Sequence, residues 1–329
     1  MTVSAKRALG IGLLWAAVTL VVPAATPAPP TAVVSVAEGE SLVLIRSSAM
    51  YAAPSGVSLS SGDLIESKPD SLLILEFRCG ATLCGVAAMG PSTRAYWMDR
   101  PGGVTLALMG GWIKVDTLAP AQTLAFKVQG THLGASSSAG SYIVHAAQGI
   151  DEVFHESGTM TLWVQKPDGN GLPRNSNPNE FASRSGSSEV LAQPRPAPAF
   201  LNSLPAAFRD PLPMGMSARF PGNTEPKFVR DVSYEDVSDW LAAPLSWRQR
   251  FTVRFRPRLK DPVFFHALDM HMSSHTEWNH ILHPPPPPEP SAPSEPTTKA
   301  VTEAQKNRVD PAHPENAEVA PSTVPSSPP

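Results

Sequence analysis

Residues 33–166 consist of short runs of β-branched and apolar residues separated by Gly, Pro, Ser and Asp. No helical pattern of ten or more residues interrupts these runs. Several short strands at this spacing predict a mainly β domain with an antiparallel sandwich or barrel-like architecture. The expected strands are residues 33–36, 41–46, 72–77, 104–108, 112–115, 124–128, 142–146 and 160–164.

The start of the chain is typical of an exported protein. Lys6 and Arg7 precede an apolar run at 8–22, and the small residues Pro23-Ala24-Ala25 follow. This order matches a secretory signal peptide, so we expect residues 1–25 to be removed by cleavage after Ala24 or Ala25. The apolar run is shorter than the ~20 residues that span a membrane, and an uncleaved anchor is the alternative. Export predicts a location in the periplasm or outer envelope of a bacterium.

Changes in composition divide the rest of the chain. Residues 167–203 are rich in Pro, Asn, Ser and Gly and have no hydrophobic period, which predicts a flexible linker. Residues 204–283 carry Trp, Phe and Leu at helical spacing, which predicts a separate module of three to four helices. Residues 284–329 are proline-rich and lack aromatic residues, so we expect a disordered tail.

Two helices of the module have recognisable starts. Asp231 or Ser233 can cap a helix whose first turn contains Glu235 and Asp236. The pair Asp261-Pro262 places a cap before a proline at the first helical position, which predicts the start of another helix.

Several segments of residues 33–166 resemble the FecR domain family, the extracytoplasmic sensor domain of iron-citrate type transmembrane regulators and of many other envelope proteins. These segments are Gly62-Asp63-Leu64-Ile65-Glu66-Ser67, residues 71–77, Gly90-Pro91-Ser92-Thr93, residues 108–115, Phe126-Lys127-Val128 and Glu156-Ser157-Gly158. The resemblance implies a FecR-like β-domain that binds or senses an envelope component. The helical module resembles C-terminal segments that follow such domains, and this resemblance implies no chemistry.

The two cysteines mark a departure from that family. Cys79-Gly80-Ala81 stands where the family commonly has Asp-Gly-Ser, and Cys84 lies on the expected returning strand. With residues 80–83 as the loop, the two cysteines can face each other at the roughly 4.4–6.8 Å Cα separation of a disulfide. In an oxidising compartment we expect this bond, with a redox-active pair or a metal-binding pair as alternatives.

A locally basic run lies in the helical module, with no acidic residue between its ends. It could contact anionic lipid, lipopolysaccharide phosphates or an acidic partner. The alternative is neutralisation by acids of the same module. The run consists of Arg248, Arg250, Arg254, Arg256, Arg258 and Lys260, and the acids include Asp231, Glu235, Asp236 and Asp239.

Five histidines lie between positions 266 and 283. His271 and His275 are four residues apart and could share a metal ion on a helix. They also project onto the side that carries Phe264 and Leu268, so packing explains them without a metal. We expect no cofactor, and these two histidines are weak metal candidates.

The sequence has no Gly-x-Ser-x-Gly elbow, no Gly-rich phosphate loop and no carboxylate pair at a specific spacing. We therefore expect a non-enzymatic binding or sensing protein whose partner is an envelope protein or a glycan. The net charge of -3 gives no reason to expect nucleic acid. One alternative is a periplasmic component of transmembrane signalling that acts through a separate partner, because about seven residues precede the apolar run. Another is a hydrolase acting on the cell wall.

Overall fold

The computed structural model describes residues 31–37, 42–98, 100, 103–118, 125–166, 169–220 and 224–285. The expected signal peptide at 1–25 and the tail from residue 286 onward lie outside these residues. The expectation of a β-rich domain with a small helical module is confirmed. The described residues up to Leu282 belong to one compact unit.

In the described residues, twelve strands span the region expected to be β. Four of them, β3, β4, β5 and β8, were not among the expected strands, and β7 is the expected returning strand that carries Cys84. The strands are β1 (Thr31–Ala37), β2 (Leu42–Arg46), β3 (Ala49–Ala52), β4 (Ser58–Leu59), β5 (Leu64–Ser67), β6 (Leu73–Cys79), β7 (Thr82–Met89), β8 (Arg94–Met98), β9 (Gly103–Thr117), β10 (Ala125–Gln129), β11 (Leu133–Ala147) and β12 (Ile150–Lys166). Most neighbours are antiparallel, but β9 and β10 pair in parallel.

Long bent strands join the two layers of the sandwich. The first half of β9 pairs with β8 and β10, whereas its second half pairs with β7 and β11. The change occurs at Gly110-Gly111, where Gly111 has a φ of 93°. Strands that switch sheets at such bends form the corners of orthogonal sandwiches. The two strands expected at 104–108 and 112–115 are therefore one strand, because the glycine pair makes a bend instead of a turn.

The bend is fixed where two segments of the FecR resemblance meet. Thr93 Oγ1 accepts a hydrogen bond from Trp112 N at 2.9 Å and donates one to Gly90 O at 2.8 Å. A Cβ at Gly111 would lie 2.5 Å from the Cα of Thr93. Only glycine combines this close approach with a positive φ.

The strands bury apolar side chains on both faces, which is unusual for an antiparallel sheet. On β8, Ala95 and Trp97 enter one core, whereas the alternating Tyr96 and Met98 enter another. The central core lies between the layers and includes Leu44, Ile65, Leu75, Trp97, Ile113, Val115, Phe126 and Tyr142. A second core, here called the strap-side core because residues 194–220 (the strap) cover it, includes Ile74, Val86, Ala88, Trp112, Ile143, Phe200, Phe208 and Leu212. The helix-side core joins Ile45, Leu64, Tyr96, Met98 and Ala107 to aromatic residues of the helices.

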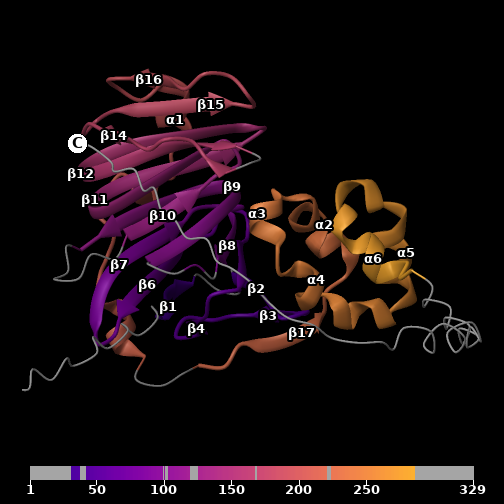
Figure 1. The fold of residues 1–329 in the computed structure, drawn as a ribbon. Coiled ribbons are helices and arrows are strands. Elements are labelled where there is room, and N and C mark those ends of the chain that lie inside the picture. The colour runs from indigo at the N-terminus through magenta and orange to yellow at the C-terminus, as the bar shows by residue number, and fades with distance from the viewer. Residues whose placement is uncertain are drawn as a thin grey trace, which may run out of the picture. The chain divides into compact units, whose positions relative to one another are not determined.

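The expectation of a flexible linker at 167–203 is wrong for the residues that the structure describes. Residues 169–193 form β13 (Gly169–Asn170), β14 (Arg174–Ser176), β15 (Phe181–Ser185) and β16 (Leu191–Gln193). β14 and β15 both pair with β12, beside which they lie in Figure 1. Their short polar sequences give no apolar period, because these strands bury few side chains and obtain their order from backbone pairing with β12.

Residues 194–220, here called the strap, cover the apolar face formed by β6, β7, β9 and β11. The strap contains α1 (Pro198–Ser203), η1 (Ala206–Phe208) and η2 (Met216–Arg219). Phe200 and Phe208 are fully buried in the strap-side core, and the Phe200 ring lies 5.1 Å from that of Trp112. The strap is therefore part of the folded core.

Residues 232–282, here called the helical cover, pack on the other apolar face. Strand β17 (Lys227–Asp231) pairs with β3 and leads into this cover (Figure 1). The apolar residues expected at helical spacing are divided among several short helices. The elements are α2 (Tyr234–Ala242), α3 (Leu245–Arg248), α4 (Phe251–Arg254), η3 (Arg256–Lys260), α5 (Pro262–Met270), η4 (Met272–Ser274), η5 (Thr276–Trp278) and α6 (Asn279–Leu282). Trp240, Trp278 and Phe264 are buried against the strand side chains, so the cover shares a core with the sheet.

We predict that a fragment of residues 31–193 does not fold stably, because it would expose the strap-side and helix-side cores to water. It should bind a hydrophobic dye, self-associate and show no cooperative thermal transition. A fragment of residues 31–285 is the matched control and should melt cooperatively. A monomeric, cooperatively melting 31–193 fragment would contradict this prediction.

Candidate functional site

Three buried charged side chains on the sheet meet the backbone of the strap. Glu76 is fully buried and accepts hydrogen bonds from Met216 N at 2.6 Å and from Ser217 N at 3.1 Å. The Ser217 hydroxyl donates a third bond to the same carboxylate. A buried carboxylate is stable only when its oxygens are bonded in this way. Glu76 therefore ties β6 to η2.

Lys114 and Asp116 make the equivalent contacts from β9. Lys114 Nζ donates to Phe208 O at 2.9 Å and Asp210 O at 3.1 Å, while Asp116 Oδ2 accepts from Leu212 N at 2.9 Å. Both side chains are buried. These contacts attach the strap to the sheet at successive points. They explain why charged residues lie on this largely apolar face.

A polar pocket of about 390 Å³ opens beside these two residues, at the bend of β11 and β12. Glu156 forms one wall: its carboxylate pairs with Lys114 Nζ at 2.9 Å and accepts from Ser141 Oγ at 2.5 Å. Exposed Arg209 of the strap also lines the pocket. The pocket thus combines a cation, a carboxylate and hydroxyl groups, and its walls belong to both the sandwich and the strap.

Glycines shape this pocket. Gly140 on β11 stands opposite Gly158 on β12 in the register, with φ values of 134° and 84°. A Cβ on Gly140 would lie 2.1 Å from Ser157 O. The two strands can therefore bend together only with glycine at both positions.

The six residues of the basic run do not form one anion-binding face, which corrects that expectation. Arg248 donates to Leu241 O and to Ser274 O, and it pairs with Glu277 at 3.1 Å. Arg250, Arg256 and Lys260 are exposed. Arg254 and Arg258 are engaged inside the fold, as described next.

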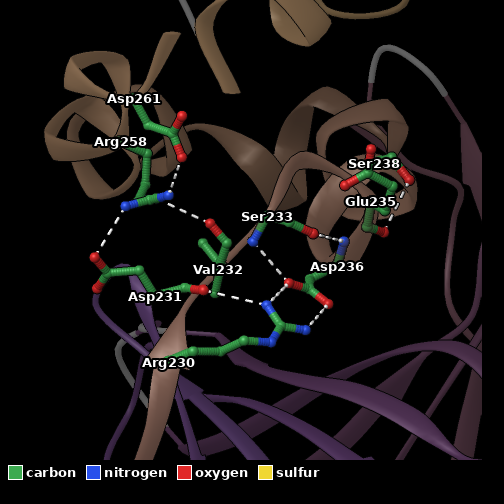
Figure 2. Close-up of polar contacts among 9 residues, drawn as sticks. All are labelled: Arg230, Asp231, Val232, Ser233, Glu235, Asp236, Ser238, Arg258 and Asp261. Atoms are coloured by element: carbon green, nitrogen blue, oxygen red, sulfur yellow. Dashed lines mark hydrogen bonds and ion pairs between the residues drawn. The ribbon is translucent and has the colours of Figure 1, made fainter. Parts of the chain in front are cut away.

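Arg258 holds the start of the helical cover (Figure 2). It pairs with Asp231 at 2.9 Å and with Asp261 at 2.6 Å, and its Nε donates to Val232 O. Figure 2 also shows the capping box of α2, in which Ser233 and Asp236 bond to each other's backbone N–H. Of the two expected caps, Asp231 and Ser233, the structure has Ser233. Part of the basic run is neutralised by acids of the same module, the alternative given for it.

Asp236 also accepts a bidentate contact from Arg230, with Nη2 at 2.8 Å from Oδ1. Burial alone would raise the pKa of the Asp236 carboxyl, but the bonds from Arg230 and Ser233 outweigh it and hold that pKa below its usual value. The Asp236 carboxylate in the first turn of α2 is therefore charged at neutral pH.

Arg254 joins the helical cover to the hairpin of β2 and β3. Its guanidinium donates to Ser47 O, Gly62 O and Ile45 O and lies over the rings of Phe251 and Phe255. Burial lowers the pKa of Arg254 to about 10, so the side chain remains charged at neutral pH. The same arginine lines an open groove of about 630 Å³ with Tyr96 and Val253.

His271 and His275 have partners within the helical cover. His271 Nδ1 contacts Ala267 O at 2.8 Å and its ring stacks on Tyr234. His275 is buried, and its Nε2 lies 2.9 Å from Leu268 O. In the described part of the chain, no three His, Cys, Asp or Glu side chains come together as a metal-binding group.

The expected disulfide is present between Cys79 and Cys84, with a Cα separation of 5.8 Å. The two residues are not direct partners, because Cys79 pairs with Thr82 and the register shifts between Phe77 and Arg78. The turn is therefore shorter than the expected loop at 80–83. None of the helices in the described ranges has the length and apolar character needed to span a membrane.

Comparison with known proteins gives a partial structural likeness. No family model and no curated protein matches the chain. A crystal structure described as a putative anti-sigma factor from Parabacteroides distasonis ATCC 8503 matches with a TM-score of 0.29 at 14% identity, over 34% of this chain and 51% of that chain. A second structure with the same description has a TM-score of 0.28 at 15% identity, over 49% and 65%. The chain thus spans less than two thirds of either protein.

We predict that Arg254→Gln lowers the free energy of unfolding by about 2–4 kcal/mol, because three backbone carbonyls lose the charged group that donates to them. Chemical denaturation measures this loss. Arg256→Gln, at an exposed position of the same run, is the control and should stay within about 0.5 kcal/mol of the parent. Equal stability of the two variants would mean that Arg254 does not hold the hairpin.

Because the imidazole of His275 is buried, we predict that the free energy of unfolding depends on pH. Burial lowers the pKa of its imidazole in the folded chain, whereas the unfolded chain binds the proton near pH ~6.5. Between these values the unfolded state binds more protons, so the free energy of unfolding falls as the pH falls below about 6.5. His275→Gln keeps a donor for Leu268 O and should melt with a shallower loss on acidification. His280→Gln, at an exposed position, should retain the parent slope; identical slopes in all three proteins would refute the assignment.

Proposed function

We propose that this chain is a non-enzymatic binding or sensing protein of the bacterial cell envelope, and that it recognises a glycan at the polar pocket between sandwich and strap. The proposal rests on the two contacts of Lys114, which bonds both to Glu156 inside the pocket and to Phe208 O of the strap. A ligand at Glu156 and Arg209 would therefore change the contacts that hold the strap.

The chemistry of the pocket suits sugar hydroxyl groups. The Glu156 carboxylate accepts hydrogen bonds, Arg209 donates them, and Ser141 and Ser157 can do both. A ligand with several adjacent hydroxyls can satisfy these groups together, whereas an apolar ligand would leave them unpaired. The export expected from residues 1–25 and the FecR resemblance are the reasons for placing this ligand in the envelope.

A sensing role follows from how the strap is attached. Backbone contacts to Glu76, Lys114 and Asp116 hold it, so a ligand that binds one strap position better than another shifts the equilibrium between them. A periplasmic signalling component acting through a separate partner is the second form of this proposal, with the strap as the surface whose state the partner reads.

We predict that the chain without residues 1–25 cosediments with purified peptidoglycan sacculi and that Arg209→Gln weakens this binding several-fold. Arg219→Gln is the matched control, since Arg219 is an exposed strap arginine that does not line the pocket. Binding should also slow hydrogen exchange at residues 205–217. If neither sacculi nor their soluble saccharide fragments bind, or if both variants bind alike, the pocket is not a glycan site.

A further inference from the structure

Strand β17 is an exposed edge of the sheet. All five of its residues are exposed, and among the described strands it pairs with β3 alone. Phe228 and Val229 leave 62% and 52% of their surface in water. An edge strand with exposed apolar side chains is a template for adding another strand.

A bulge interrupts the pairing of β17 with β3 at the centre of the strand. In the register with β3, Phe228 pairs with Tyr51 and Arg230 with Met50, so Val229 between them has no partner residue. Such a bulge leaves the extra residue outside the ladder. After Val229 the pairing with β3 resumes at Arg230, and Val232 N donates to Ser48 O at 3.1 Å.

The sequence of β17 is complementary to itself. If two copies are antiparallel about a two-fold axis at Val229, Lys227 of one copy lies opposite Asp231 of the other. Phe228 then lies opposite Arg230, and the two Val229 residues face each other. Opposite charges, an aromatic with a cation and a β-branched pair are each favourable across antiparallel strands.

The side chains retain surface for these contacts. Asp231 pairs with Arg258 through one oxygen, and its side chain is 58% exposed. Arg230 pairs with Asp236 and remains 48% exposed. The contacts that β17 makes within its own chain therefore leave both groups reachable from outside.

We infer that β17 is a homodimerisation strand, which adds antiparallel to β17 of a second copy about a two-fold axis at Val229. The interface repeats every contact twice, as an isologous dimer requires. Five residues a side form a small contact, so the dimer is weak and its population depends on protein concentration. This inference is independent of the pocket and of its ligand.

Charge exchange within the strand tests this inference. Lys227→Glu places Glu opposite Asp231 of the other copy at two symmetric positions and should weaken the dimer several-fold in sedimentation equilibrium. Asp231→Lys should do the same, and the double variant Lys227→Glu/Asp231→Lys should regain dimerisation, since the opposite charges are restored in exchanged positions. A monomer at every concentration, or a dimer indifferent to both single variants, would overturn the inference.

A cysteine at the axis gives a second, geometric test. Val229→Cys should form a disulfide-linked dimer under mild oxidation, because position 229 of one copy lies opposite position 229 of the other. Val253→Cys is the control, since Val253 is 77% exposed but lies on α4. Far faster crosslinking at 229 supports the strand pairing. Equal rates at both positions would contradict it, and a mixed disulfide with another protein's strand in place of the homodimer would also reject it.

Discussion

The burial of apolar side chains on both faces of the same strands is the constraint on which this structure depends. Along β8, neighbouring residues alternate between the central core and the helix-side core, as Trp97 and Tyr96 illustrate. A sandwich alone can cover only its inner faces. The strap and the helical cover are therefore required by the strand sequences, and the stability of the whole unit comes from three cores that share their strands.

Charged residues determine where the strap is attached and why the attachment could respond to a ligand. Glu76, Lys114 and Asp116 are buried and bond to strap backbone groups. Because the strap covers these charges and removes them from water, each needs the hydrogen bonds of the strap backbone to offset the cost of its desolvation. Because Lys114 also contacts Glu156 in the polar pocket, the same ion links a solvent-open site to an internal contact. That link is the physical basis of the proposed sensing role.

The sequence predicted the β-domain, the disulfide and the caps at Ser233 and Asp261, because these depend on local alternation, a short hairpin and near neighbours in the chain. It did not predict the strap. Polar residues at 167–203 obscured strands whose order comes from pairing with β12. A usable signal existed, since Glu76, Lys114 and Asp116 are charged residues at alternate positions of strands that place the apolar Ile74 and Trp112 on the same side. The partners of Arg254 could not be found, because Ser47, Gly62 and Ile45 are brought to it only by the fold.

We expect the sandwich, the strap and the helical cover to unfold as one cooperative unit. Native-state hydrogen exchange measured against denaturant concentration tests this expectation. The slowest amides of α2, of the strap near Phe208 and of β8 should open with the same free energy and the same denaturant dependence. Amides of α2 that exchange through a separate opening of much lower free energy, while β8 remains protected, would instead show an independent helical module.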